Sequence, residues 1–357
     1  MVASKIFTLL VGATTGNVIS SVRFDPSSKD ISLIGKSYSG PNPSWISTHP
    51  HNNSILLSAN EGRPLGGLST FVITDRKNGV IKRVSNSSSF GDTPAYMAAL
   101  SSVRQVGVMD YFSGNGAFIP LGKDLLTLDA ANAQKITFDA NVSHPHQVVE
   151  HGDEVLVPDL GADKIWRLKQ QPRQGRIPNW QVRGFIQQPA GSGPRHIVVH
   201  DGIVYTIHET ASTLTSQRLP PLGSDTQPKI ISSFSVLPPG VNQSAFGAAE
   251  LVLDAKRKLI YTSNRDQSPS GPSDPRGDAI TIFSFDRDGK LKPTSQIFTG
   301  LNRVRGMAQG GPDNMYIAAA GQTGGGLAIF EKDGNTLKKR ARLAAGHIDQ
   351  PAGFVWL

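Results

Sequence analysis

Four charged or titratable side chains stand at matching places in a repeated sequence pattern and could together perform acid–base chemistry on an anionic molecule. His146 and Arg195 each follow a proline, in "PHQV" and "PRHI", while Glu209 and Arg265 end the apolar runs "IVYTIHE" and "LIYTSNR". Arginine carries a permanent charge and a fork of donors that suits carboxylate or phosphate. Histidine and glutamate can exchange protons near neutral pH when their surroundings shift their pKa values. We therefore predict that Arg195 and Arg265 bind substrate and that His146 and Glu209 are catalytic.

A structural role for the same four residues is the alternative. A buried charge is costly unless it is paired, so these side chains could instead form ion pairs that hold neighbouring parts of the fold together. The residue types alone leave both interpretations open.

The pattern that carries these residues repeats about every 51 residues. In each unit a proline or small residue leads into a short apolar run, and the seven starting points are Pro43, Pro94, Pro145, Pro194, Ala248, Val304 and Pro351. Further apolar runs bring each unit to about four strands, as in a propeller blade. The sequence therefore predicts an all-β, seven-bladed β-propeller with almost no helix.

The seventh unit lacks its second strand, and the N-terminus offers one. The run "IFTLLVGAT", residues 6–14, has the required apolar character. We predict that this N-terminal strand completes the C-terminal blade, which closes the ring and protects its edges, and that residues 1–357 form a single domain. The segments 220–248 and 266–278 are expected to be long loops of the blades.

Equivalent positions of a propeller gather around one central channel. The residues directly after the seven starting points are Ser44, Ala95, His146, Arg195, Ala249, Arg305 and Ala352, and those that end the second strands are Glu61, Tyr111, Leu160, Glu209, Arg265, Gly321 and Ala13. Because side chains alternate along a strand, His196 and His208 are expected to point away from the channel as packing groups. Three further residues could lie at the rim, namely Glu250, Arg303 and Arg305. A recurring set is expected to cap turns, namely Asn60, Asp110, Asp159 and Asn264.

Composition excludes several classes of function. The chain has no cysteine, which rules out disulfides, thiolate metal sites and a cysteine nucleophile. No apolar run reaches the ~18 residues of a membrane helix, and no block of basic and aromatic residues indicates nucleic-acid binding. The formal net charge of +8 is typical of a mildly basic surface, and attraction of an anionic ligand is the alternative interpretation. We expect a cytoplasmic protein without metal or organic cofactor, whose first residues begin a strand rather than a secretion signal.

Several segments resemble the seven-bladed propeller lactonase family, which includes 6-phosphogluconolactonases and the carboxy-cis,cis-muconate lactonising enzymes. The resemblance covers essentially the whole chain and is carried by "HPHQVV", "VPDLGADKIW", "GSGPRHIVVH" and "AAELVLDAKRKLIYTSNR". It implies that a histidine, two arginines and a glutamate form the site, and these match His146, Arg195, Arg265 and Glu209. It also implies that the site uses no metal or organic cofactor.

Three functions are compatible with these residues. The favoured one is hydrolysis of an anionic sugar-acid lactone such as 6-phosphogluconolactone, with water activated by Glu209 or His146. The second is lactonisation of a carboxymuconate, in which the same residues would hold carboxylates and deliver a proton to carbon. The third is a propeller that binds a partner without catalysis, which the four charged channel residues disfavour.

Overall fold

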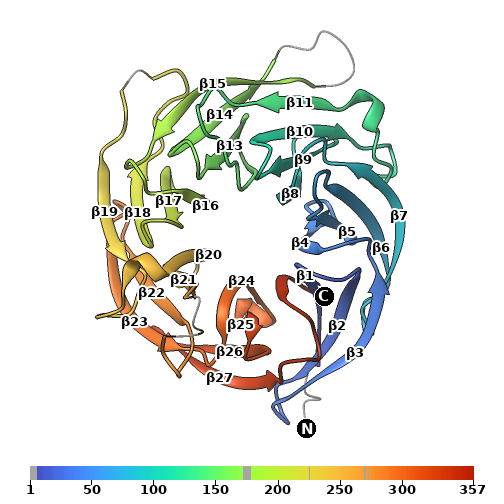
Figure 1. The fold of residues 1–357 in the computed structure, drawn as a ribbon, viewed down its shortest axis with the longest axis vertical. Coiled ribbons are helices and arrows are strands. Elements are labelled where there is room, and N and C mark those ends of the chain that lie inside the picture. The colour runs from blue at the N-terminus through green and yellow to red at the C-terminus, as the bar shows by residue number, and fades with distance from the viewer. Residues whose placement is uncertain (1–5, 172–177, 225, 269–270, 272) are drawn as a thin grey trace.

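The fold is a ring of seven four-stranded antiparallel sheets around a central axis (Figure 1). It was analysed as a computed structural model, which describes residues 6–171, 178–224, 226–268, 271 and 273–357. The seven-bladed β-propeller predicted from the repeat is confirmed. Within the described residues the only helices are three short 3-10 turns, η1 (Ala130–Asn132), η2 (Gln243–Ala245) and η3 (Pro312–Asn314), and none is long enough to cross a bilayer.

Each blade runs from the channel outward, and we number the blades by their innermost strands. The innermost strands are β4 (Pro43–His49), β8 (Pro94–Ala99), β12 (Val149–His151), β16 (Pro194–His200), β20 (Phe246–Asp254), β24 (Asn302–Gly310) and β28 (Pro351–Trp356). The second strands are β5 (Asn52–Asn60), β9 (Gln105–Asp110), β13 (Glu154–Asp159), β17 (Ile203–His208), β21 (Leu259–Asp266), β25 (Tyr316–Gly324) and β1 (Phe7–Ala13). The predicted starting points thus lie at or near the beginnings of the innermost strands.

The outer half of each blade is built in the same way. The third strands are β6 (Gly67–Asp75), β10 (Asn115–Pro120), β14 (Lys164–Gln170), β18 (Thr213–Arg218), β22 (Ala279–Phe285), β26 (Leu327–Asp333) and β2 (Val18–Asp25). The outermost strands are β7 (Val80–Ser88), β11 (Gln134–Thr137), β15 (Trp180–Gln187), β19 (Ile230–Ser235), β23 (Leu291–Phe298), β27 (Thr336–Leu343) and β3 (Asp30–Tyr38).

Burial explains why the second strands read as continuous apolar runs. Every residue of β1, β9, β13 and β17 is buried, because neighbouring blades cover both faces of each sheet. One apolar cluster, for example, joins Tyr261 of blade 5 to Phe330 of blade 6. Burial on both faces removes the alternation of apolar and polar residues that a half-exposed strand shows.

The N-terminal strand closes the ring as predicted. Strand β1 lies between β28 and β2, with Leu9 opposite Trp356 and Leu10 opposite Val355. Blade 7 therefore takes one strand from the C-terminus and three from the N-terminus (Figure 1). Residues 1–5, which precede the predicted strand and for which no secretion signal was expected, lie outside the described residues.

One predicted loop is wrong. The outermost strand β19 lies inside the segment 220–248 that was expected to be irregular. Its residues are exposed or half-buried, and its sequence IISSFS contains the β-forming residues Ile and Phe, which the loop prediction overlooked. The other predicted loop agrees with the structure, since the described residues of 267–278 contain no strand.

A β-bulge at the start of most innermost strands positions the channel residues. The register shifts at the residue after the starting proline, between Pro43 and Trp45, between Pro94 and Tyr96, and between Pro194 and His196. An extra residue in one strand re-aims its side chain and increases the local twist. In blade 4 that extra residue is Arg195, and in blade 6 the corresponding shift lies between Val304 and Met307 and includes Arg305.

Candidate active site

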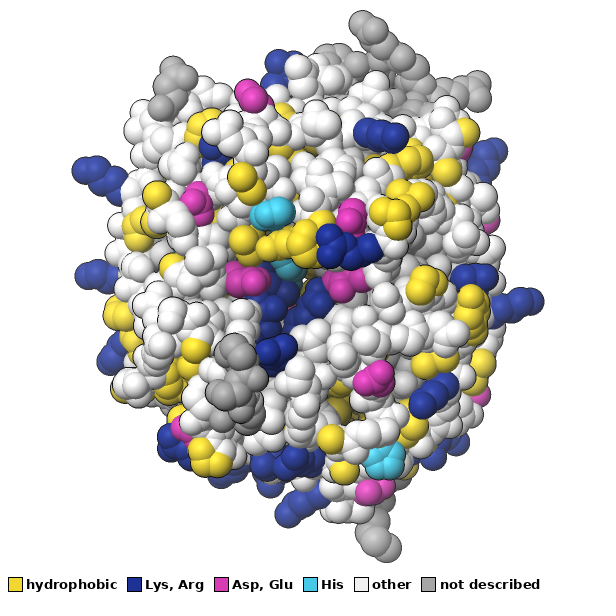
Figure 2. Space-filling view, viewed as in Figure 1, with side chains coloured by type: hydrophobic (Ala, Val, Ile, Leu, Met, Phe, Trp, Pro, Cys, Tyr) yellow, Lys and Arg dark blue, Asp and Glu magenta, His cyan; other side chains and the backbone are white. Residues whose placement is uncertain are grey.

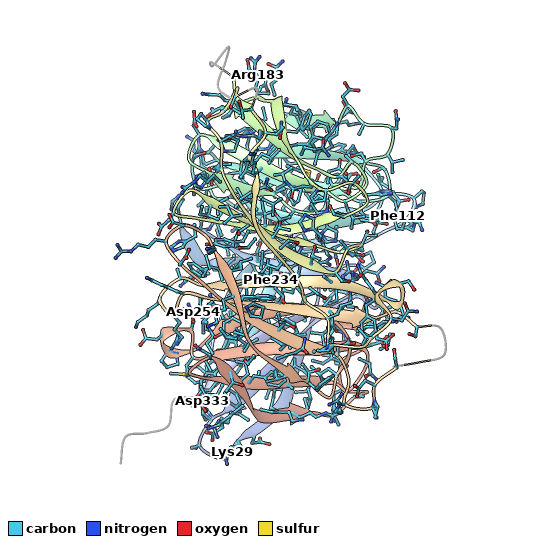
Figure 3. The ribbon with its side chains drawn as sticks, turned by 90° about the vertical axis from the view of Figure 1, so that its left-hand side faces the viewer. Lys29, Phe112, Arg183, Phe234, Asp254 and Asp333 are labelled. Atoms are coloured by element: carbon cyan, nitrogen blue, oxygen red, sulfur yellow. The ribbon has the colours of Figure 1, made fainter. Side chains whose placement is uncertain are left out.

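The site lies where the innermost strands begin, at one mouth of the channel. Figure 3 shows the ring edge-on: Phe112, after β9, projects from one face, and Asp254, at the end of β20, lies towards the other. Basic, acidic and histidine side chains gather at a hollow in the middle of the ring in Figure 2. Blades 3 to 5 contribute the four predicted residues to this region.

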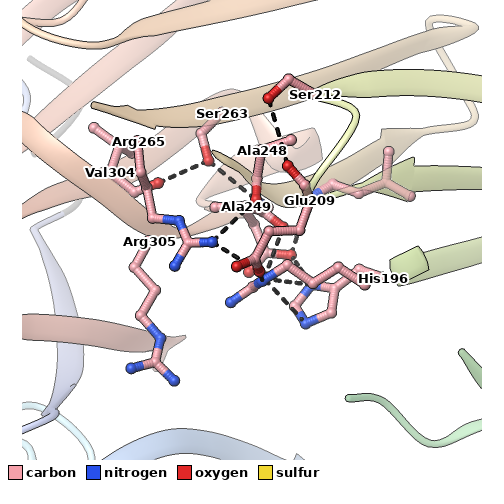
Figure 4. A network of polar contacts seen from close by, with 12 residues as sticks. His196, Glu209, Ser212, Ala248, Ala249, Ser263, Arg265, Val304 and Arg305 are labelled. Atoms are coloured by element: carbon pink, nitrogen blue, oxygen red, sulfur yellow. Dashed lines mark hydrogen bonds and ion pairs between the residues drawn. The ribbon is translucent and has the colours of Figure 1, made fainter. Parts of the chain in front are cut away.

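Arg195 and Arg265 share one oxygen atom of Glu209. The Oε2 atom of Glu209 lies 2.9 Å from Nε of Arg195 and 2.7 Å from a terminal nitrogen of Arg265. Arg195 also donates to the carbonyl oxygen of Ala249 at 2.7 Å, and Arg265 to that of Ala248 at 3.2 Å (Figure 4). Arg195, Glu209 and Arg265 therefore form one charged network between blades 4 and 5. The ion pairs expected if these residues had a structural role are thus present as well.

The network keeps Glu209 ionised. Burial alone would raise its pKa, but the charges of Arg265 and Arg195 outweigh burial and lower the pKa below the usual value for glutamate. Both arginines bind the Oε2 atom of Glu209. The Oε1 atom accepts no hydrogen bond from any of the described residues. The second oxygen of a partly exposed carboxylate is thus available to a ligand or water.

His146 is buried beside this network in its neutral form. It precedes the short strand β12, and its backbone N–H donates to Pro158 at 2.9 Å. Burial, followed by the charge of Arg195, holds the pKa of His146 well below its usual value. Its Nδ1 atom is buried and has no hydrogen-bond partner. A neutral imidazole with one unpaired ring nitrogen can accept or donate one further hydrogen bond.

His196 does not point away from the channel, and that prediction is wrong. Its ring nitrogens lie 3.3 and 3.5 Å from a terminal nitrogen of Arg195, its ring centroid lies 5.1 Å from that of His146, and its Nδ1 lies 2.8 Å from Oε1 of Glu250. The bulge at Arg195 interrupts the alternation of side chains on which the prediction relied. His208, in contrast, is a buried packing group as predicted, 3.1 Å from Gln188.

Sequence reasoning gave too little weight to a third arginine. Arg305 occupies the bulge position of blade 6 and pairs with Glu61, which follows the second strand of blade 1. Its charge is among those that lower the pKa of His146 and of Glu209, so it belongs to the same region. Arg305 directly follows a starting point and Glu61 ends a second strand, the two repeat positions that supply the other site residues. Their repeat positions could therefore have identified both residues as part of the site.

Tyr111 completes the wall of the site on the side of blade 2. Its ring lies 5.8 Å from that of His146 and stacks on His144 at 4.6 Å, measured between centroids. Burial raises its pKa, so the phenol stays protonated and can donate a hydrogen bond. Of the other two predicted rim residues, Arg303 donates to the carbonyl oxygen of Asp266, and Glu250 is buried.

The recurring polar residues at the strand ends hold turns, as predicted for Asp159. Its carboxylate accepts from the backbone N–H groups of His144, Gly161 and Ala162. Asn60 donates to Pro41 O, and Asn264 accepts from Ala279 N. Asp110 differs, because one of its oxygens is buried without a partner and burial raises its pKa to about 7. No group of three or more His, Asp or Glu side chains with the spacing of a metal site occurs among the described residues.

The channel continues beyond the charged network towards the opposite face. A cavity of about 650 Å³ lies where the innermost strands end, and its lining includes Trp45, Glu250 and Met307. Trp45 and Tyr96 pack their rings at 4.2 Å between centroids, and both lie against His196. The aromatic layer of Trp45, Tyr96 and His196 thus lies between the charged network and this cavity.

Comparison with known proteins agrees with the seven-bladed fold and identifies the family of the chain. A family model described as "Lactonase, 7-bladed beta-propeller" matches residues 8–352. The chain belongs to this family. The lactonase propeller is 25% identical over 347 residues to a 6-phosphogluconolactonase of Formosa agariphila, covering 92% of this chain and 94% of the relative. It is 24% identical over 317 residues to a 6-phosphogluconolactonase of Sodalis glossinidius, covering 87% of this chain and 82% of the relative.

A solved structure shares the fold of the lactonase propeller. The periplasmic gluconolactonase of Pseudomonas aeruginosa superimposes with a TM-score of 0.83 at 22% identity, covering 99% of both chains. At this identity the likeness establishes the architecture, and the chemistry must be argued from the residues of the site.

Proposed function

We propose that this lactonase propeller hydrolyses the ring ester of an anionic sugar-acid lactone, with 6-phosphogluconolactone as the first substrate to test. The observation that carries the proposal is the shared carboxylate oxygen: Arg195 and Arg265 converge on Glu209 beside a neutral His146. The names of the two relatives support the substrate class.

In this proposal Glu209 and His146 hold the attacking water. The free Oε1 of Glu209 and the unpaired Nδ1 of His146 are the two acceptors for its protons. General acid–base groups must lie within hydrogen-bond reach of the proton that they move. The water oxygen forms a bond to the lactone carbonyl carbon, while one proton passes to Glu209 or His146.

The arginines stabilise the negative charge that develops on the carbonyl oxygen. Donors fixed in advance at that position are worth most in a site that excludes water, and Arg195 is buried and held by three partners. The bond between the carbonyl carbon and the ring oxygen then breaks, and the protonated base returns its proton to that oxygen. The product acid ionises, so each turnover releases one proton.

Cyclisation of a carboxymuconate is not proposed, because the two relatives named above are phosphogluconolactonases. We propose that the arginines supply the electrophilic charge without a metal ion. The cytoplasmic location stays a prediction.

The decisive experiment measures the acid released when the lactone is hydrolysed. Purified protein is mixed with freshly prepared 6-phosphogluconolactone in weakly buffered indicator dye, and acid release is measured against the spontaneous rate. We expect release well above that rate. A muconate absorbance assay on the same preparation tests the alternative, and loss of muconate signal without acid release from the lactone would overturn the proposal.

A further inference from the structure

The third arginine of the site has a different environment from the other two. Arg195 and Arg265 bind a shared carboxylate and backbone carbonyl groups, whereas Arg305 donates both of its hydrogen bonds within the described residues to Glu61. In Figure 4 Arg305 lies beside Arg265, without a dashed line to Glu209. The side chain of Arg305 is 19% exposed, against 3% for Arg195. Arg305 is therefore the more accessible cation.

Arg305 keeps donors that no described residue binds, whereas an unpaired donor of Arg265 is buried. The Nε atom of Arg265 is buried and has no hydrogen-bond partner in the described chain. Glu61 accepts hydrogen bonds from the two terminal nitrogens of Arg305. Some of the five N–H donors of the Arg305 guanidinium therefore remain free. A partly exposed guanidinium group with free donors suits an oxyanion that can accept several hydrogen bonds at once.

The ion pairs of the site leave Arg305 with the most exchangeable partner. Arg195 and Arg265 share Glu209, Glu250 lies against His196 beside Arg195, and Arg305 pairs with Glu61. Because Glu209 is committed to two arginines, Glu61 is the carboxylate that an incoming anion can replace most easily. Exchanging one anion for another at Arg305 avoids leaving a partly buried charge unpaired.

We propose that Arg305 forms a subsite for the phosphate ester of the substrate, and that Glu61 is the counter-ion that occupies it in the empty site. This inference rests on the proposed function, because it assigns the remote charged group of the lactone whose ring ester is cleaved at Glu209 and His146. Arg305 then determines specificity and takes no part in the proton transfer.

The test compares two lactones that share a ring and differ in the phosphate. Steady-state kinetics of the full chain are measured with 6-phosphogluconolactone and with glucono-δ-lactone. Arg305→Gln should raise KM for the phosphorylated lactone by about 10- to 100-fold, the size of a lost charge-assisted hydrogen bond, with kcat within about twofold. The neutral lactone should lose far less, because Arg305 acts on it only through the effect of its charge on the pKa values of His146 and Glu209. Equal losses for both lactones, or no change for either, would overturn the subsite.

The control is a matched arginine in the same blade. Arg340 pairs with Glu331 on the outer strands of blade 6, so Arg340→Gln removes the same charge far from the channel. It should leave both lactones unaffected. A KM increase in Arg340→Gln equal to that in Arg305→Gln would assign the effect to net charge and contradict the subsite.

Binding of inorganic phosphate separates the subsite from the catalytic proposal. Calorimetric titration should show phosphate binding to the wild type, weaker binding to Arg305→Gln and tighter binding to Glu61→Gln, since the last variant frees Arg305. If the wild type hydrolyses neither lactone but this order of affinities holds, the catalytic proposal fails and the anion subsite stands. If phosphate does not bind, or binds the wild type and Arg305→Gln equally, the subsite is wrong.

Discussion

His196 lies against Glu250 across the boundary between blades 4 and 5, with 2.8 Å between Nδ1 and Oε1. A terminal nitrogen of Arg195 lies against the same imidazole, 3.3 Å from Nε2 and 3.5 Å from Nδ1. A carboxylate at Nδ1 keeps the proton on that nitrogen and leaves the other as an acceptor. Glu250 and His196 together thus hold the guanidinium of Arg195 in place.

Removing the charge of Glu250 should disturb Arg195 without unfolding the blade. In Glu250→Gln the side-chain amide can turn either way towards His196, so the imidazole loses its preferred tautomer. We expect kcat to fall by about tenfold, which corresponds to ~1.4 kcal/mol of transition-state stabilisation, with little change in Tm. Kinetics and thermal unfolding on one preparation measure both quantities.

The control for that prediction is another buried histidine. His208→Gln removes a packing group that bonds Gln188 away from the network, and it should lower Tm while kcat of the folded protein stays the same. If Glu250→Gln behaves like His208→Gln, then Glu250 has only a structural role.

Glu209→Gln should reduce turnover far more than it reduces stability. The amide keeps the size of the side chain but loses the charge that binds two arginines and the basicity at Oε1. General acid–base groups contribute about 10²–10⁴-fold, and we expect a loss of kcat in that range. A variant that melts much earlier but turns over normally would mean that the carboxylate serves only to pair buried arginines.

The pH dependence should show an acid limb at unusually low pH. Arg265 and Arg195 lower the pKa of Glu209 despite its burial, so the carboxylate remains ionised well below ~4.3, the usual glutamate value. The neutral state of His146, whose pKa is also lowered, predicts no inflection of kcat/KM near pH 6.5. An inflection there that disappears in His146→Asn would contradict the buried neutral imidazole.

Stability should follow the same ionisation. A carboxyl group whose pKa is lower in the folded chain stabilises it at any pH above the unfolded value, and that contribution is lost as the pH falls through the folded value. The wild type should therefore lose Tm below pH ~4 more steeply than Glu209→Gln. Parallel curves for the two proteins would show that Glu209 contributes no such linkage.

Removal of divalent metal should leave the hydrolysis rate unchanged. In the proposed chemistry Arg195 and Arg265 provide the positive charge at the carbonyl oxygen. Dialysis against EDTA followed by the acid-release assay checks this, with re-addition of Ca²⁺, Mg²⁺ or Zn²⁺ as the control. Activity that disappears on dialysis and returns with one ion would assign the electrophile to that ion.

Deletion of the first 13 residues should prevent closure of the ring. Strand β1 is wholly buried between β28 and β2, so its loss exposes two strand edges and an apolar cluster. We expect a fall in Tm of more than 10 °C or an insoluble product, whereas Ile6→Ala, at an exposed position before the strand, should behave as wild type. We also propose that residues 1–357 unfold as one domain, which a single calorimetric transition would support and two separate transitions would contradict.

The sequence by itself determined the architecture of this protein and the ring position of each charged residue. A repeat of about 51 residues specifies seven blades, the missing strand after Pro351 requires the N-terminal run, and equal positions in a closed ring must face the same channel. That logic led to His146, Arg195, Glu209 and Arg265, and it also contained Arg305 and Glu61. The outermost strand β19 carries a short β-forming run, IISSFS, that the loop prediction overlooked.

The tertiary structure alone decided which of these groups meet. Contacts across the channel depend on the register shift at each bulge and on side-chain rotamers, and neither follows from spacing along the chain. The shift at Arg195 turned His196 into the channel towards Glu250. Two long side chains on neighbouring blades converged on one oxygen of Glu209, while the equivalent Arg305 reached Glu61 instead. The repeat determines where in the ring the backbone of each residue lies. The partner of its charged group depends on packing against the neighbouring blades.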